Sequence, residues 1–213
     1  MNSKDDSEFL ETGEKVVLIG DALVGKTSIL NRYTKNIFNE KTKPTVGCDL
    51  FQKNVKLPSK KKIRLTIWDT AGQERFRGLS SAFYKNTKCV ILVFDISHKR
   101  TFDNLERWLD EARTFACNMA LIIVIGNKSD LEIERKVNRE LALKFTERNK
   151  IFYSETSALE NNDGNIQSVF EFVADWIDKN KEEWKKTNGQ GKDFYLNNID
   201  LSKKKKEKDL CEC

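Results

Sequence analysis

This 213-residue sequence has one histidine, and it lacks long apolar runs. No stretch approaches the roughly 18 apolar residues that suggest a membrane-spanning helix. The N-terminal stretch MNSKDDSEFLET lacks the basic start and apolar core of a secretory signal, and Asn2 stands where N-myristoylation requires glycine. We therefore expect a cytosolic protein with one core of ordinary globular size.

The five cysteines do not have the pattern of a disulfide framework or a zinc site, so Cys48, Cys89 and Cys117 are interpreted as packing residues. The formal net charge is +5, but the run 203–208 alone places five lysines against one glutamate. Nucleic-acid-binding proteins more often spread cations along a groove-sized surface, with aromatic residues among them. Because the excess charge here lies in the tail, we expect no nucleic-acid partner.

Short β-branched runs alternate with helical patterns from about residue 15 to 179, as in a three-layer α/β domain. The predicted strands are 15–20, 49–57, 62–68, 89–95, 121–127 and 151–157, with the second and third forming a hairpin. Helical spacing predicts two core-facing stripes, which are Phe102, Leu105, Leu109, Ala112 and Phe115, and then Ile166, Val169, Phe170, Val173 and Ile177. The predicted divisions are an N-terminal extension at 1–12, a domain at 13–182 and a flexible basic tail at 183–213.

The segment GDALVGKTS, residues 20–28, matches the phosphate-loop pattern between a predicted strand and a predicted helix. Gly20 and Gly25 let the backbone wrap a polyphosphate at a helix N-terminus. Lys26 is expected to reach the β and γ phosphates, and the Thr27 hydroxyl to bind Mg²⁺. This motif by itself leaves ATP and GTP open, together with kinase, ATPase and switch functions.

The segment WDTAGQE, residues 68–74, begins at the end of the third predicted strand. A carboxylate there, Asp69, is suited to hold a water of the magnesium shell. Gly72 has no side chain that would keep a γ-phosphate from its amide, and Gln73 is placed to orient an attacking water.

Two further motifs select guanine over adenine. NKSD, residues 127–130, follows a buried strand at the edge where open α/β sheets bind ligands. We expect Asp130 to accept hydrogen bonds from the guanine N1–H and 2-amino group, Lys128 to lie across the base, and Asn127 to brace the loops. In ETSAL, residues 155–159, the Ala158 amide is expected to donate to the guanine 6-oxo group, whereas adenine would set an amino donor against that amide.

The four motifs, in this order, resemble those of the Ras superfamily of small GTPases, and TVGCDLF, WDTAGQERF and the terminal Cys-Glu-Cys resemble the Rab family. The resemblance implies a P-loop NTPase fold, a small-GTPase domain with a six-stranded, mostly parallel sheet, one strand antiparallel, flanked by helices. It also implies that Thr45 completes the Mg²⁺ shell in the GTP state and that Phe38 packs against the base. The nucleotide-binding residues are then expected to be Gly20, Ala22, Leu23, Val24, Gly25, Lys26, Thr27, Ser28, Phe38, Thr45, Gly72, Asn127, Lys128, Asp130, Ser157, Ala158 and Leu159, with Thr27, Thr45 and Asp69 (through water) at the metal.

Some residues depart from the usual Rab pattern. Ala22 and Leu23 stand where Ser and Gly are common, and their bulk predicts slow intrinsic hydrolysis. Leu159 replaces a lysine, which predicts weaker nucleotide retention. Rab effectors commonly contact three aromatic residues, and the resemblance places these positions at Leu50, Trp68 and Phe83, of which Leu50 is aliphatic.

In Rab proteins a Cys-x-Cys terminus carries two geranylgeranyl chains, so Cys211 and Cys213 are the expected lipidation sites. Two lipid chains anchor a protein stably where one is marginal, and the neighbouring lysines add attraction to anionic leaflets. Without the cysteines, a solvated tail or a nuclear signal would be the better interpretation.

The resemblance therefore implies a monomeric GTP/GDP switch in vesicle traffic, on the cytoplasmic face of an intracellular membrane with a cytosolic pool bound to a carrier. Its partners would be an exchange factor, a GTPase-activating protein, a prenyl-shielding carrier and effectors. Two alternatives stay open at this point. One is a GTPase fold held in one nucleotide state as a membrane-bound scaffold, and the other is a phosphate-loop kinase or ATPase.

Overall fold

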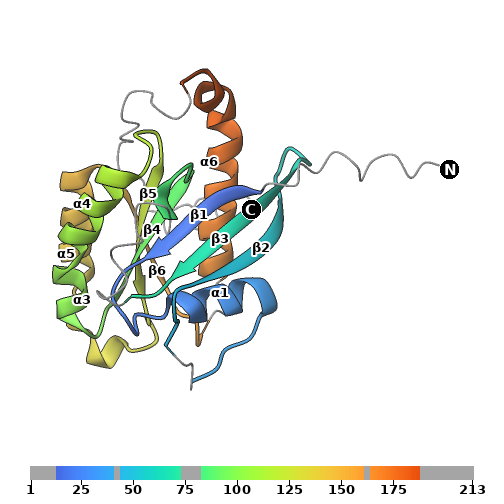
Figure 1. Cartoon of the computed structure of the whole chain (residues 1–213). Coiled ribbons are helices and arrows are strands. Elements are labelled where there is room, and N and C mark those ends of the chain that lie inside the picture. Colours follow the sequence, from blue (N-terminus) through green and yellow to red (C-terminus); the bar gives the residue numbers. More distant parts are fainter. Residues whose placement is uncertain (1–12, 41–43, 73–82, 161–163, 188–213) are drawn as a thin grey trace, which may run out of the picture.

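A twisted β-sheet forms the centre of the molecule (Figure 1). The computed structural model describes residues 13–40, 44–72, 83–160 and 164–187. Within these ranges the strands are β1 (Glu14–Ile19), β2 (Cys48–Lys56), β3 (Lys62–Thr70), β4 (Cys89–Asp95), β5 (Leu121–Asn127) and β6 (Phe152–Thr156). Their order in the sheet is β2-β3-β1-β4-β5-β6. Only the β2–β3 pair of this sheet is antiparallel, so the predicted α/β fold is confirmed.

Helices cover both faces of the sheet. They are α1 (Lys26–Lys35), α3 (Lys99–Asp103), α4 (Leu105–Phe115), α5 (Arg139–Asn149) and α6 (Asn165–Thr187), with a short 3-10 helix η2 (Glu132–Glu134). Strand β1 shows why there are two cores. Its side chains alternate between faces, so Val16 and Leu18 pack with residues of α1 and α6, while Val17 packs with residues of α3, α4 and α5.

The predicted core stripes differ from the structure at one residue. Phe115 is 42% exposed, whereas the other nine stripe residues are buried. It ends α4, and its ring stacks on Tyr84 at a centroid distance of 6.1 Å, which leaves the rest of the ring in solvent. Of the three cysteines interpreted as packing residues, Cys89 is buried and the other two are half-buried.

Helix α6 continues to Thr187, five residues beyond the predicted end of the domain at residue 182. Trp184 explains the extension because it is only 9% exposed and belongs to the core on the α1 and α6 face. The Lys88 ammonium lies 3.7 Å from the centroid of its ring. A cation over an indole face stabilises this last turn against the body of the domain.

The parallel strands point their carboxyl ends toward one edge of the sheet, where the loops after β1, β3, β5 and β6 meet. Ligands of open α/β folds bind at this edge. In the described part of the chain, no helix combines the length and the apolar character needed to cross a membrane.

Candidate functional site

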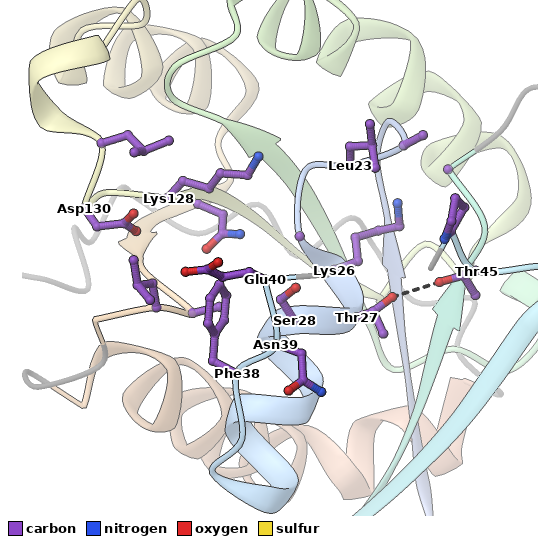
Figure 2. Close-up of a pocket in the computed structure, with 18 residues that line it drawn as sticks. Leu23, Lys26, Thr27, Ser28, Phe38, Asn39, Glu40, Thr45, Lys128 and Asp130 are labelled. Atoms are coloured by element: carbon purple, nitrogen blue, oxygen red, sulfur yellow. Dashed lines mark hydrogen bonds between the residues drawn. The ribbon is translucent and has the colours of Figure 1, made fainter. Parts of the chain in front are cut away.

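A cavity of about 590 Å³ opens at the carboxyl edge of the sheet (Figure 2). Fourteen of the residues predicted to bind nucleotide line it, and they are Ala22, Leu23, Gly25, Lys26, Thr27, Ser28, Phe38, Thr45, Gly72, Asn127, Lys128, Asp130, Ala158 and Leu159. Gly20, Val24 and Ser157 are buried and are not among the residues that line the cavity. Asn39, Glu40, Pro44 and Leu131 also line the cavity, although the sequence motifs did not single them out.

Two glycines of the phosphate loop are required by their surroundings. Gly20 has a φ of 138° and Gly25 a φ of 95°, and L-residues rarely adopt such values. A Cβ on Gly20 would lie 2.2 Å from the Val93 carbonyl oxygen, and one on Gly25 would lie 2.3 Å from Asn127 Nδ2. The loop can therefore pass close to β4 and β5 only with glycine at both positions.

Lys26 lies inside the phosphate loop with 5% of its surface exposed. Its Nζ donates hydrogen bonds to the carbonyl oxygens of Gly20 and Asp21, each at 2.9 Å. Burial lowers the pKa of this lysine to about 8, and the Asp69 and Asp21 carboxylates oppose the shift. An anion entering the loop would restore the preference for the charged form.

Three oxygen-bearing side chains converge beside Lys26. The Thr27 hydroxyl donates to Asp69 Oδ2 at 2.5 Å and lies 2.8 Å from the Thr45 hydroxyl, which is itself 3.4 Å from the same Oδ2. Figure 2 shows Thr27 and Thr45 pointing toward each other. In the described ranges, the buried Asp69 Oδ1 accepts no hydrogen bond. Burial is the main reason why the pKa of Asp69 is raised.

These groups fit a hard divalent cation. Mg²⁺ prefers oxygen ligands and usually takes one or two protein groups together with waters and substrate phosphates. Over the described part of the chain, three or more His, Cys, Asp or Glu side chains nowhere gather as a metal cluster. Hydroxyls and one carboxylate beside a phosphate loop are the donor set expected for a cation that arrives with a nucleotide.

Asn127 and Ser157 organise the other end of the cavity. Asn127 is 1% exposed, and its Nδ2 donates to the carbonyl oxygen of Val24 at 2.8 Å, which joins β5 to the phosphate loop. The Thr156 hydroxyl donates to Asn127 Oδ1 at 3.3 Å. The Ser157 hydroxyl donates to the carboxylate of Asp130. Three loops are thus held together at this end, and the bracing expected of Asn127 is present in the structure.

Lys128 is held by a carboxylate that the motifs did not reveal. Its Nζ lies 2.6 Å from Asp95 Oδ2, and the Asp95 side chain is 3% exposed. Asp95 also accepts hydrogen bonds from the Ser97 hydroxyl at 2.6 Å and the Ser97 amide at 2.8 Å, while His98 Nδ1 lies 3.1 Å from Oδ2. Burial raises the pKa of Asp95, but the Lys128 ammonium and the hydrogen bonds from Ser97 lower it by more, so the pKa lies below its usual value.

One signal could have identified Asp95 from the sequence. It ends the buried strand CVILVFD, and its register partner in β5 is Asn127, the first residue of NKSD. A carboxylate at the carboxyl end of a parallel strand points to the ligand edge of the sheet.

The two ends of the cavity are spatially separate. Figure 2 shows Phe38 and Asp130 on one side, with Thr27 and Thr45 on the other. Gly72 lies near the phosphate loop, where a Cβ would approach the Ala22 nitrogen to 2.4 Å. The predicted residues Gln73, Cys211 and Cys213 lie outside the described residues.

An apolar surface lies on β2 and β3, beside the segment that carries Thr45. Leu50 is 55% exposed and is the register partner of Trp68, whose ring centroid lies 6.1 Å from that of Phe83. The three residues that the resemblance pointed to are therefore near neighbours, two of them in ring contact.

Comparisons with known proteins agree with this geometry. The Ras family model matches residues 15–179. "Ras-related protein Rab-11C" of Dictyostelium discoideum is 45% identical over 171 residues, which is 80% of this chain and 74% of that protein. "Ras-related protein YPTC6" of Chlamydomonas reinhardtii is 43% identical over 169 residues, or 79% of this chain and 76% of that protein. "Ras-related protein Rab11A" of Lotus japonicus is 44% identical over 172 residues, covering 81% and 73%.

Proposed function

Because this chain belongs to the Ras family, as a Rab-type small GTPase, we propose that the cavity at the carboxyl edge of its sheet is the guanine-nucleotide site. The chain is a GTP-hydrolysing switch in vesicle traffic, with a membrane-associated role. The observation that best supports the proposed site is the meeting of Thr27, Thr45 and Asp69 at one end of the cavity, with Asp130 at the other.

At the phosphate end, the loop around Lys26 holds the polyphosphate of GTP. The Lys26 ammonium turns from the Gly20 and Asp21 carbonyls toward the β and γ phosphates. Thr27 and Thr45 would hold Mg²⁺ through their hydroxyls, and Asp69 would hold it through a water. When bound, this ion neutralises charge on the phosphates.

At the base end, Asp130 accepts from the guanine N1–H and 2-amino groups, and the Ser157 hydroxyl keeps its carboxylate oriented. Lys128 covers one face of the base with its aliphatic stem, while its ammonium stays on Asp95. Phe38 packs against the base from another side. The Ala158 amide donates to the 6-oxo group. Ala22, Leu23, Val24, Gly25, Ser28, Gly72 and Leu159 complete the site.

Hydrolysis needs a positioned water, and Gln73 is the residue that we propose orients it. We propose that no arginine of the chain itself acts on the γ-phosphate. Intrinsic cleavage is therefore slow, and an activating protein accelerates it. When the γ-phosphate leaves, Thr45 and Gly72 lose their contacts with it, and the segments that carry these two residues relax. Effectors that bind Leu50, Trp68 and Phe83 in the GTP-bound form then dissociate.

The tail supplies the proposed membrane anchor. Geranylgeranylation of Cys211 and Cys213, with the lysines of 203–208 beside them, would hold the protein on the cytoplasmic face of an intracellular membrane. A carrier would shield the lipids in the cytosol, and an exchange factor would reload the nucleotide. We propose that the protein acts as a monomer, with an N-terminal extension at 1–12, a domain that ends with α6 at Thr187 and not at residue 182, and the basic tail after it.

Single-turnover hydrolysis of GTP loaded with Mg²⁺ tests this function. We expect a rate well below about 10⁻² per second, the value for GTPases that supply an arginine in cis, and we expect Gln73→Leu to abolish cleavage. A competition between GDP and ADP is run on the same preparation. Equal binding of GDP and ADP would contradict the proposed guanine site. Equal cleavage by the unsubstituted protein and Gln73→Leu would contradict the proposed role of Gln73.

A further inference from the structure

Arg32 connects helix α1 to the loop that carries Ala158. The guanidinium group donates from Nε to the carbonyl oxygen of Ala158 at 2.8 Å and from Nη2 to that of Leu159 at 3.2 Å. Arg32 is 126 residues away from Ala158 in the sequence. The same helix begins with Lys26 and Thr27. One side chain therefore ties the base end of the cavity to the helix that begins at its phosphate end.

The Ala158 amide is constrained on both sides. The Ser157 hydroxyl precedes it and donates to Asp130, while the Glu160 amide donates to the Ser157 hydroxyl at 2.8 Å. Arg32 holds the two carbonyl oxygens that follow the amide. A guanidinium group can hold two acceptors at once because its donors form a rigid planar fork.

A third contact reaches the segment that leads to Phe38. Arg32 Nη1 donates to the carbonyl oxygen of Asn36 at 3.2 Å and to its side-chain Oδ1 at 3.1 Å. Asn36 caps the C-terminus of α1 in the left-handed conformation, with a φ of 54°. Phe38 follows two residues later and lines the cavity. The fork thus joins α1 to two of the segments that surround the base.

We propose that Arg32 is a positioning residue for guanine specificity, which holds the Ala158 amide where it meets the 6-position of the base. This role rests on the proposed guanine site. Arg32 does not line the cavity, so it acts through the loop and not on the nucleotide. Asp130 is held by Ser157 and not by Arg32. Recognition at the 6-position should therefore depend on Arg32 more strongly than recognition at the 2-position.

Three nucleoside diphosphates separate these two contacts. GDP carries the 6-oxo, N1–H and 2-amino groups, and the hypoxanthine nucleotide lacks only the 2-amino group. The 2,6-diaminopurine nucleotide carries an amino donor in place of the 6-oxo group, and its N1 carries no hydrogen. The missing N1–H weakens the Asp130 contact in every variant alike, so a change of preference on substituting Arg32 reports on the 6-position. A donor set against the Ala158 amide is rejected strongly only while that amide is held in place.

The experiment measures the dissociation constants of the three nucleotides for the full-length chain and for Arg32→Gln, Arg32→Lys and Lys35→Gln. Lys35 is the matched control, because it is an exposed cation on the same helix whose ammonium lies over the Phe51 ring. In Arg32→Gln we expect the preference for GDP over the diaminopurine nucleotide to fall by about tenfold or more. The preference for GDP over the hypoxanthine nucleotide should stay within about twofold.

Arg32→Lys keeps the charge and loses the fork, so it should resemble Arg32→Gln. Lys35→Gln should resemble the unsubstituted chain. If all three affinities weaken together in both Arg32 variants, the arginine is merely structural and the proposal is overturned. If the unsubstituted chain does not distinguish GDP from the diaminopurine nucleotide, the proposed guanine site itself fails, which is a different result from a failure of Arg32.

Discussion

The hydroxyl oxygens of Thr27 and Thr45 lie 2.8 Å apart, although the residues are 18 positions apart in the sequence. Thr27 is fixed in the first turn of α1, whereas Thr45 belongs to the segment between α1 and β2. Both approach Asp69 Oδ2, at 2.5 Å and 3.4 Å. The structure therefore has this segment closed onto the phosphate loop, the arrangement proposed above for the GTP state.

Removing the Thr45 hydroxyl should weaken the response of the GTP-loaded protein to Mg²⁺. In Thr45→Ala we expect the Mg²⁺ concentration that half-suppresses nucleotide release to rise by about tenfold, which corresponds to about 1.4 kcal/mol. Thr45→Ser keeps the hydroxyl and is the control. Release is followed with a fluorescent GTP analogue across a Mg²⁺ titration, and identical curves for Ala and the unsubstituted protein would exclude Thr45 as a ligand.

Replacing the Asp130 carboxylate with an amide should change base selection. Asn presents a donor where guanine also presents donors, whereas xanthine carries an oxygen at the 2-position that accepts a hydrogen bond. For Asp130→Asn we expect GDP binding to weaken by at least about a hundredfold and xanthosine diphosphate to become the better ligand. Competition binding measures both. Unchanged preference for GDP would show that Asp130 is not the base selector.

The affinity of the nucleotide-free protein for GDP should fall as the pH rises through about 8, because the lowered pKa of Lys26 lies there. Phosphate binding requires the charged ammonium, so above this pH each nucleotide bound takes up a proton. Each further pH unit then costs up to about tenfold in affinity. Calorimetric titrations between pH 7 and 9 measure the slope, and Lys26→Arg, which stays charged, should show a flatter one. Parallel slopes in the two proteins would contradict this assignment.

The same pKa affects the stability of the nucleotide-free domain. Burial lowers the pKa of Lys26 from 10.5 to about 8, so between these values the unfolded chain binds more protons than the folded one. The free energy of unfolding should therefore rise with pH across that window, as far as Lys26 contributes. Urea unfolding at pH 8 and pH 10, compared with Lys26→Met, isolates the contribution. The rise should be smaller in Lys26→Met, and an equal or larger rise in this variant would contradict the prediction.

Trp108 should stabilise the phosphate loop through Asp21. Its Nε1 donates to Asp21 Oδ1 at 2.8 Å, and Asn104 Nδ2 donates to Asp21 Oδ2 at 2.6 Å. We expect Trp108→Phe to lower the free energy of unfolding by about 1.5–3 kcal/mol, as for a hydrogen bond to a charged group. Urea unfolding of Trp108→Phe, Asp21→Asn and the double variant forms a cycle. Simple additivity would show that the two side chains are not coupled.

Leu23 should be a source of backbone strain. It has a φ of 65° and is 76% exposed, so the left-handed conformation costs free energy that little burial offsets. Leu23→Gly should raise the free energy of unfolding by up to about 1 kcal/mol. Glycine avoids the cost of the left-handed conformation, but its greater entropy in the unfolded chain offsets part of this gain. Leu23→Ala keeps the strain and should bring no gain. Equal gains from both variants would show that the added stability comes from removing the leucine side chain and not from relieving backbone strain.

The motifs could be read from the sequence because each is local. Two glycines, a lysine and a threonine in GDALVGKTS reflect backbone and charge requirements of one loop, and NKSD and ETSAL each follow one strand. The alternating and continuous apolar patterns likewise predicted the six strands found in the described residues and the β2–β3 hairpin. The family and the fold are therefore confirmed, while the residue-level roles stay predictions.

Contacts between distant segments could not be read in this way. The sequence around Lys128 does not indicate that its ammonium pairs with Asp95. Arg32 looks like an ordinary polar residue of an amphipathic helix, and only the fold shows that its guanidinium group binds the loop of Ala158. The same holds for Phe115, whose spacing fits the stripe although its ring lies partly in solvent.

The sequence by itself thus determined the fold and the family, and it predicted the residues that we propose bind a guanine nucleotide, because hydrophobic period and loop chemistry act over a few residues. The tertiary structure decided how those groups are held. It closed Thr45 onto Thr27, placed Asp95 under Lys128, and set Arg32 behind Ala158. Each of these depends on strand order and helix packing, which bring together residues that local periodicity leaves independent.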